Sequence, residues 1–167
     1  RMPAAILGHI LGGSMASRMF DEIREKRGLA YAVYSSFDMN TTYGSFLTYA
    51  GVEHENTEKV IELICKEYVK IRDKGVSDEE LVRTKESMKG RLALSLEGSD
   101  DLAFYVGGEE VLTGKPLTPE EVYSKIDKVS KEDVIKIADE IFQPERLNLT
   151  IIGPHKDKEK FEKILKL

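Results

Sequence analysis

Apolar residues recur along this chain with two different spacings, one typical of helices and one typical of strands, and the spacing changes at a few well-marked positions. Apolar residues at first recur every three or four positions, which predicts a short helix over residues 3–11 that two glycines stop. Ser14 has the chemistry of an N-cap, so the same spacing predicts a second helix that runs to Arg27 and ends at a left-handed Gly28.

From residue 31 onward, strict alternation replaces the helical spacing and predicts a β-hairpin. A polar turn at 40–42 separates two alternating runs, at 31–39 and 43–52, that are rich in aromatic and β-branched residues. We expect one side of the first strand to carry Tyr31, Val33, Phe37 and Met39.

The second half of the chain is predicted to be mostly helical. An apolar stripe after Asn56 and a capping-box pattern of Ser77 with Glu80 mark two long helices, the second of which ends near Leu96. Shorter elements are expected at five further places: helix starts at Ser99, Thr118 and Ser130, a closing strand at 145–153 and a last helix at 156–167. The pattern predicts one α+β domain over residues 1–167, a two-layer sandwich with helices packed on one face of a small sheet.

The composition of the chain argues against several classes of binding partner and bound metal. The charged fraction is 33% with a net charge of −5 and a pI near 5.4, so the chain has no general basic field and no nucleic-acid partner is expected. No apolar run reaches the roughly 18 residues that a membrane span needs, so none is expected. Cys65 is the only cysteine, which excludes a disulfide within the chain and a multi-cysteine zinc cluster.

His9, His54 and His155 are the candidate metal ligands, and they form neither HExxH, nor HxxEH, nor a pair four residues apart. His9 lies among apolar helix residues, as a packed histidine does, and His54 beside Glu55 is typical of a solvated polar pair. We therefore expect this chain to bind no metal by itself. Cys65 falls in an apolar helical stripe and is predicted to be a buried structural thiol rather than a nucleophile.

Two glycine pairs, Gly12–Gly13 and Gly107–Gly108, raise the question of phosphate-binding loops. Neither pair completes GxxxxGK[ST] or GxGxxG, and the first pair follows a helix rather than a strand. Helix termination and close packing are the better interpretation. The mixture of Lys and Glu at 156–166 is interpreted as a solvated helix face.

Arg24 and Tyr31 remain as a pair that could carry chemistry. Arg24 is expected in the last turn of the second helix, where a cation complements the helix dipole, and Tyr31 at the entry of the first strand. Both side chains can therefore project at the same edge of the sheet. From spacing alone, an ordinary helix-end arginine and a half-buried strand tyrosine are the better interpretation.

A longer stretch of sequence around Arg24 and Tyr31 favours a functional interpretation of the pair. The run "ILGGSMASRMFDEIREKRGLAYAVYSSF" at 10–37 resembles the carboxy-terminal, non-zinc half of the pitrilysin-type metallopeptidases. That family includes insulin-degrading enzyme, the mitochondrial processing peptidase and bacterial processing proteases, and the chain looks most similar to the last group. Its marks here are "LGG" at 11–13, "SRMF" at 17–20 and "REKRGLAY" at 24–31, and the similarity extends over nearly all of the chain.

The resemblance implies a zinc metalloendopeptidase built from two homologous halves that close around a chamber. Zinc would be bound by an HxxEH motif in the other half, in the same polypeptide or in a partner chain, so this chain alone is expected to be inactive. Arg24 and Tyr31 match the arginine and tyrosine with which the non-zinc half reaches the substrate. Tyr31 would donate its hydroxyl to the carbonyl oxygen that becomes an oxyanion, and Arg24 would bind a backbone carbonyl of the substrate.

The family fold also implies a mixed, mostly antiparallel sheet whose first strand precedes the first helix, and that strand is missing here. An exposed sheet edge is expected to hold a peptide or unfolded-protein substrate, and it could pair with a second copy to form a homodimer. The chain opens at Arg1 and enters a helix almost at once, so we expect a substrate-binding C-terminal domain cut from a longer polypeptide. Its expected compartment, by default, is the cytoplasm.

Two alternatives remain open at this point. The first is a catalytically inactive partner or scaffold subunit of the same fold, and the presence of both Arg24 and Tyr31 argues against it. The second is a generic α+β binding module whose likeness to the family is limited to the fold.

Overall fold

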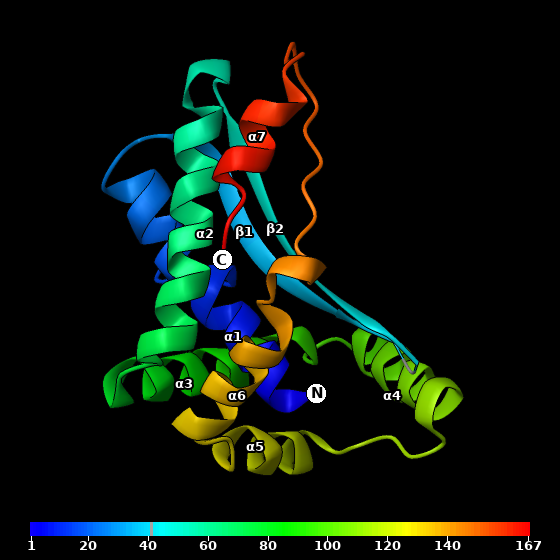
Figure 1. Cartoon of the computed structure of the whole chain (residues 1–167). Coiled ribbons are helices and arrows are strands. Elements are labelled where there is room, and N and C mark those ends of the chain that lie inside the picture. Colours follow the sequence, from blue (N-terminus) through cyan, green and yellow to red (C-terminus); the bar gives the residue numbers. More distant parts are fainter. Residues whose placement is uncertain (41) are drawn as a thin grey trace.

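The computed structural model describes residues 1–40 and 42–167, and its α+β architecture confirms the predicted fold class. Two strands form one antiparallel hairpin, and helices pack on one of its faces (Figure 1). In chain order the elements are α1 (Met2–Gly12), η1 (Phe20–Glu25), β1 (Ala30–Met39), β2 (Gly44–Val52), η2 (His54–Asn56), α2 (Thr57–Lys74), α3 (Asp78–Ser95), α4 (Ser99–Thr113), α5 (Pro119–Asp127), α6 (Lys131–Ile141), η3 (Pro144–Arg146) and α7 (Lys158–Ile164).

Helix α1 lies at the centre of the core. It is apolar on nearly every side, as a helix enclosed by other elements must be, and Ile6, Leu7 and Leu11 are fully buried. It contacts β1 as well as α3, α5 and α6. Gly12 lies so close to β1 that a Cβ there would be 2.0 Å from the backbone nitrogen of Ser35. The glycine therefore allows the helix and the strand to touch, which agrees with the close packing expected for this glycine pair.

The inner face of the hairpin is covered by an aromatic cluster. The Tyr68 ring of α2 stacks on Phe142, which follows α6, with the ring centroids 4.3 Å apart. Phe46 of β2 meets the Phe142 ring edge to face at 5.2 Å. The Tyr68 hydroxyl donates to Thr48 Oγ1 at 2.5 Å, so the buried phenol is satisfied by the same strand that it packs against.

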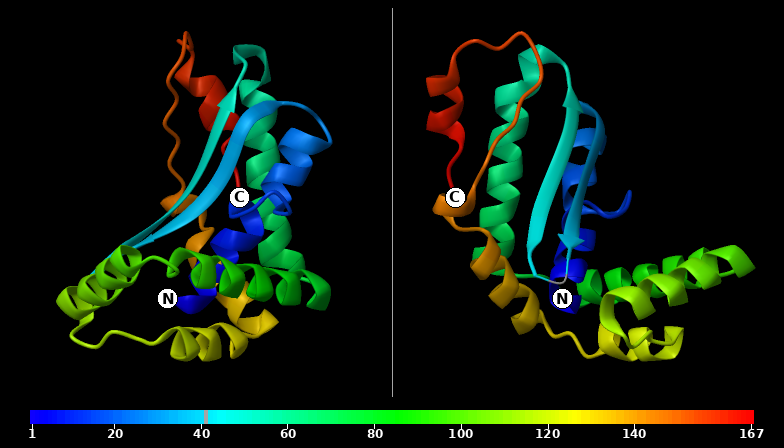
Figure 2. Two further views of the ribbon diagram at one scale, coloured as in Figure 1. Left: turned by 180° about the vertical axis from the view of Figure 1, so that it is seen from behind. Right: turned by 90° about the vertical axis from the view of Figure 1, so that its right-hand side faces the viewer.

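The outer face of the hairpin is open in the part of the chain that the structure describes. Seen from behind, β1 and β2 lie in front of α1 and α2, and no described helix covers them (left panel of Figure 2). Tyr34 and Tyr49 stack across the two strands on this side with ring centroids 5.1 Å apart, and both are about half exposed. Helices and hairpin thus form the predicted two layers.

The predicted closing strand is wrong. Residues 147–152 are extended and run along the β2 side of the hairpin (Figure 1), but they make no strand pairing within the described chain. The sequence predicted a strand here, whereas a strand exists only when its backbone groups find a partner ladder. The described sheet consequently has two antiparallel strands and no parallel pair, in contrast to the mixed sheet that was expected.

The helical segment that contains η1 begins later than predicted. Residues 13–17 form a turn, and the helix starts at Arg18. Ser14 does not cap it, because its Oγ accepts a hydrogen bond from the Ala16 amide at 3.3 Å within the turn. The turn is held from outside by Arg83 of α3, which donates to the Ala16 carbonyl oxygen at 3.4 Å. Ser14 thus stabilises a turn before the helix, and α3 contacts this turn.

The other predicted helix starts are confirmed. Thr118 and Ser130 form complete capping boxes with Glu121 and Asp133, and the Ser77 side chain accepts the Glu80 amide. The hairpin is also confirmed, although Thr41 of its predicted turn lies outside the described residues. In the described chain no helix combines the length and the apolar character needed to cross a membrane.

Candidate functional site

Arg24 is presented by a π-helical turn. In η1 the hydrogen bonds close five residues apart, as between the Lys26 amide and the Asp21 carbonyl oxygen at 2.9 Å. Such wide turns are rare and occur frequently at functional sites. Gly28, with a φ of +60°, then turns the chain toward β1, as the sequence predicted. The predicted helix end therefore exists, with a wider turn than periodicity could indicate.

Tyr31 leaves the core side of β1 because the strand bulges there. Its neighbours Ala30 and Ala32 pair with consecutive residues of β2, so Tyr31 is an extra residue without an opposite partner. Tyr31 is 88% exposed, whereas Val33 is buried. The prediction that these two residues share one side of the strand is wrong, because the bulge shifts the alternation by one position.

The structure brings Arg24 and Tyr31 together. The guanidinium carbon of Arg24 lies 5.8 Å from the centroid of the Tyr31 ring and 4.9 Å from that of the Phe20 ring. Cation–π contacts of this kind contribute about 0.5–1 kcal/mol at exposed sites. Phe20 is a residue that the sequence analysis missed, and its signal is its position four residues before Arg24 on the same helix face.

The charged neighbours of this pair neutralise one another. Glu22 forms ion pairs with Lys26 at 2.7 Å and with Arg27 at 2.5 Å, and hydrogen bonds from both cations lower the pKa of its carboxyl. Within the described residues, neither the Arg24 guanidinium nor the Tyr31 hydroxyl has a hydrogen-bond or ion-pair partner. Side by side and exposed, the two groups can donate hydrogen bonds to the same bound molecule.

The described histidines do not fit a zinc site. The structure brings the rings of His54 and His155 into contact, with centroids 5.7 Å apart, a juxtaposition that the sequence did not indicate. No group of three or more His, Cys, Asp or Glu side chains in the described chain is arranged to hold a metal ion, whereas zinc sites use three or four protein ligands.

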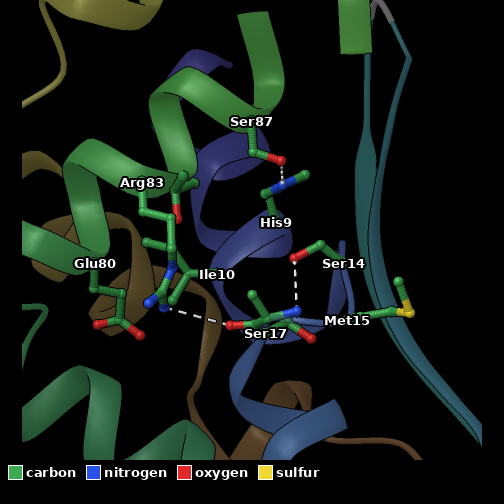
Figure 3. Close-up of a pocket in the computed structure, with 10 residues that line it drawn as sticks. His9, Ile10, Ser14, Met15, Ser17, Glu80, Arg83 and Ser87 are labelled. Atoms are coloured by element: carbon green, nitrogen blue, oxygen red, sulfur yellow. Dashed lines mark hydrogen bonds between the residues drawn. The ribbon is translucent and has the colours of Figure 1, made fainter. Parts of the chain in front are cut away.

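A cavity of about 280 Å³ lies between α1, the turn at 13–17 and α3 (Figure 3). His9 and Ser87 share a hydrogen bond of 3.0 Å on its wall, and burial together with the charge of Arg91 lowers the pKa of His9. No described carboxylate hydrogen-bonds to this imidazole, so the pair lacks the third group that orients a catalytic histidine. Neither Arg24 nor Tyr31 lines this cavity.

The remaining candidates from the sequence have structural roles. Cys65 is buried, and burial raises the pKa of its thiol, as expected for an inert packed cysteine. Gly107 and Gly108 lie inside α4, where a Cβ at either position would meet no other atom within 4 Å. This second glycine pair therefore forms no phosphate-binding loop.

Comparison with known sequences identifies relatives. The family model described as the peptidase M16 inactive domain matches residues 1–88, a range that includes Arg24 and Tyr31. An uncharacterized zinc protease of Streptomyces coelicolor is 33% identical over 159 residues, which is 95% of this chain and 34% of that protein. An uncharacterized zinc protease of Bacillus subtilis is 35% identical over 149 residues, which is 89% of this chain and 36% of that protein. The beta subunit of the mitochondrial-processing peptidase of Saccharomyces cerevisiae is 33% identical over 119 residues, 71% of this chain and 26% of the subunit.

Solved structures show the same fold. The peptidase M16 inactive domain from Pseudomonas fluorescens aligns with a TM-score of 0.72 and 25% identity, covering 83% of this chain and 33% of that one. A conserved protein from Enterococcus faecalis aligns with a TM-score of 0.71 and 27% identity, and the alignment covers 83% of this chain and 32% of that one. This chain spans about a third of the length of the curated zinc proteases that it matches. It belongs to the peptidase M16 inactive domain family.

Proposed function

We propose that this chain is the substrate-binding, non-zinc half of a zinc metallopeptidase. The observation that carries the proposal is the exposed pair of Arg24 and Tyr31, whose donors have no partner in the described chain. The names of the Streptomyces coelicolor and Bacillus subtilis relatives, both zinc proteases, support the class of reaction. The HxxEH-bearing half would lie in the same polypeptide or in a partner chain.

Tyr31 acts on the reacting carbonyl group of the substrate. Negative charge develops on that oxygen when the peptide bond is attacked, and a phenol positioned beforehand stabilises it with a hydrogen bond that strengthens in the transition state. The bulge serves this role because it directs Tyr31 away from the core side of β1.

Arg24 acts on the substrate backbone. Its planar guanidinium donates to a peptide carbonyl oxygen near the reacting bond and so fixes the register of the substrate. The Phe20 ring holds one side of the guanidinium and leaves the donor edges available. Backbone recognition of this kind selects extended peptides or unfolded protein segments rather than particular side chains.

The test compares two tyrosine variants in the intact protein, with its zinc-binding half present. Tyr31→Phe removes only the hydroxyl and should lower kcat for an unstructured peptide by about 10²-fold, the loss typical of one oxyanion donor. Tyr43→Phe is the matched control, because Tyr43 is 69% exposed but lies at the opposite end of the hairpin, beside the turn. Its kcat should equal that of the unmodified protein.

Two outcomes would contradict the proposal in different ways. Equal kcat values for Tyr31→Phe and Tyr43→Phe would remove Tyr31 from the reaction while leaving the family assignment intact. An intact protein without zinc and without peptide cleavage would instead favour a scaffold subunit of the same fold.

A further inference from the structure

Segment η1 needs contacts with the rest of the fold to keep its conformation. It has six residues, too few for a helix to be stable without tertiary contacts, and its π-helical conformation is uncommon. Met19 and Ile23 are fully buried and anchor one side of it in the core. Arg24 projects from the opposite, exposed side. The position of Arg24 therefore depends on what anchors η1, namely the burial of Met19 and Ile23 together with the contacts at the beginning of the segment.

Arg18 makes the polar anchor at that beginning. Its Nε donates to Glu80 Oε1 at 2.8 Å and its Nη2 to Glu80 Oε2 at 2.7 Å, a two-pronged ion pair in which both side chains are largely buried. The same Nη2 also donates to the Gly75 carbonyl oxygen at 2.8 Å. Charge-assisted paired bonds of this geometry are strong and directional.

The two partners of Arg18 are themselves fixed. Glu80 lies in the first turn of α3, and its amide donates to the Ser77 cap at 3.1 Å. Gly75 ends α2 with a φ of +69° and lies against Ile135, which a Cβ at this position would approach to 2.7 Å. Arg18 therefore ties η1 to a rigid junction between two long helices.

We propose that Arg18 is a positioning residue for the Arg24–Tyr31 pair. It holds η1 against the α2–α3 junction, and η1 in turn sets where the guanidinium of Arg24 meets the ring of Tyr31. This inference rests on the proposed function, because it assigns Arg18 an effect on the same reaction. Arg18 acts through the pair and does not touch the substrate.

Arg18→Lys in the intact protease tests the inference. Lysine keeps the charge but cannot bind both Glu80 oxygens and the Gly75 carbonyl in the same geometry. We expect kcat to fall by about 10- to 100-fold, the scale of a displacement of about 1 Å at a reacting group. The matched control is Arg72→Lys: Arg72 also donates to a distant backbone carbonyl, that of Phe142 at 3.2 Å, in a similarly shielded setting. Its kcat should stay within about twofold of the unmodified protein.

Combining Arg18→Lys with Arg24→Gln separates positioning from general stability, because η1 carries Arg24. Groups that act as a unit give non-additive losses, so Arg18→Lys should lower kcat far less in the Arg24→Gln background than in the unmodified protein. Equal losses in both backgrounds would overturn the inference, because Arg18 would then support activity only through the fold.

Amide hydrogen exchange provides a readout that is independent of activity. Arg18→Lys should speed exchange at residues 20–29 of the intact protein, whereas Arg72→Lys should leave these amides protected. Unchanged protection in Arg18→Lys would overturn the inference even where Tyr31→Phe behaves as proposed. Faster exchange combined with an inert Tyr31→Phe would instead overturn the proposed function and the catalytic effect of Arg18, while the anchoring of η1 would stand.

Discussion

At the scale of single residues, His9 makes the stability of the chain depend on pH. Burial, and then the charge of Arg91, lower its pKa in the folded state below the ordinary value of 6.5. Below that pH the unfolded chain binds a proton that the folded His9 does not, so the free energy of unfolding should fall as the pH falls. The fall is complete once the pH passes below the folded pKa.

Urea unfolding at pH values above and below 6.5 measures this effect. His9→Gln keeps a polar partner for Ser87 and has no proton to bind, so its free energy of unfolding should fall less over the same interval. Equal changes in the unmodified chain and in His9→Gln would show that His9 does not contribute to the pH dependence.

The residues of the site could be predicted only in part. Arg24 and Tyr31 were expected at one edge of the sheet, and the structure places them together. The orientation of Tyr31 could not be predicted, because a bulge depends on the register with β2 rather than on the local pattern. Arg18 was missed for a related reason: its partner Glu80 lies 62 residues further along the chain.

At the scale of elements, the contact between α1 and β1 yields a matched pair of substitutions. Gly12→Ala would place its Cβ 2.0 Å from the Ser35 nitrogen and force the helix off the strand, which should lower the free energy of unfolding by about 1–3 kcal/mol or more. Gly8→Ala, in the same helix, would meet Phe37 at an ordinary 3.5 Å and should leave stability unchanged or raise it by up to about 1 kcal/mol. Chemical denaturation of both variants measures the difference, and an equal loss in the two would contradict this account of the glycine.

Elements whose signals are local could be predicted well. The capping boxes at Thr118 and Ser130 mark true helix starts, because a cap is made by residues three positions apart. The extended run at 147–152 shows the opposite case, since its alternation is real but its pairing depends on a distant strand. The cap predicted at Ser14 does not form, because its hydroxyl accepts the Ala16 amide within a turn that α3 contacts.

At the scale of the whole molecule, residues 1–167 alone are not expected to catalyse peptide cleavage. Residues 1–167, purified alone and supplied with zinc, are expected to show no chelator-sensitive peptide cleavage, because their described side chains offer no metal-binding group. The intact protein under the same conditions is the positive control. Turnover by the pure chain that a chelator abolishes would contradict both this expectation and the division of labour between two halves.

The bulge at Tyr31 makes this residue dispensable for the packing of the domain. Because Tyr31 is the extra residue, deleting it would rejoin Ala30 and Ala32 in plain alternation and leave Val33 facing the core. Deletion or insertion of a single codon could therefore remove or restore the tyrosine without rebuilding the interior of the domain. The role proposed for Tyr31 is in this sense separable from the fold that presents it.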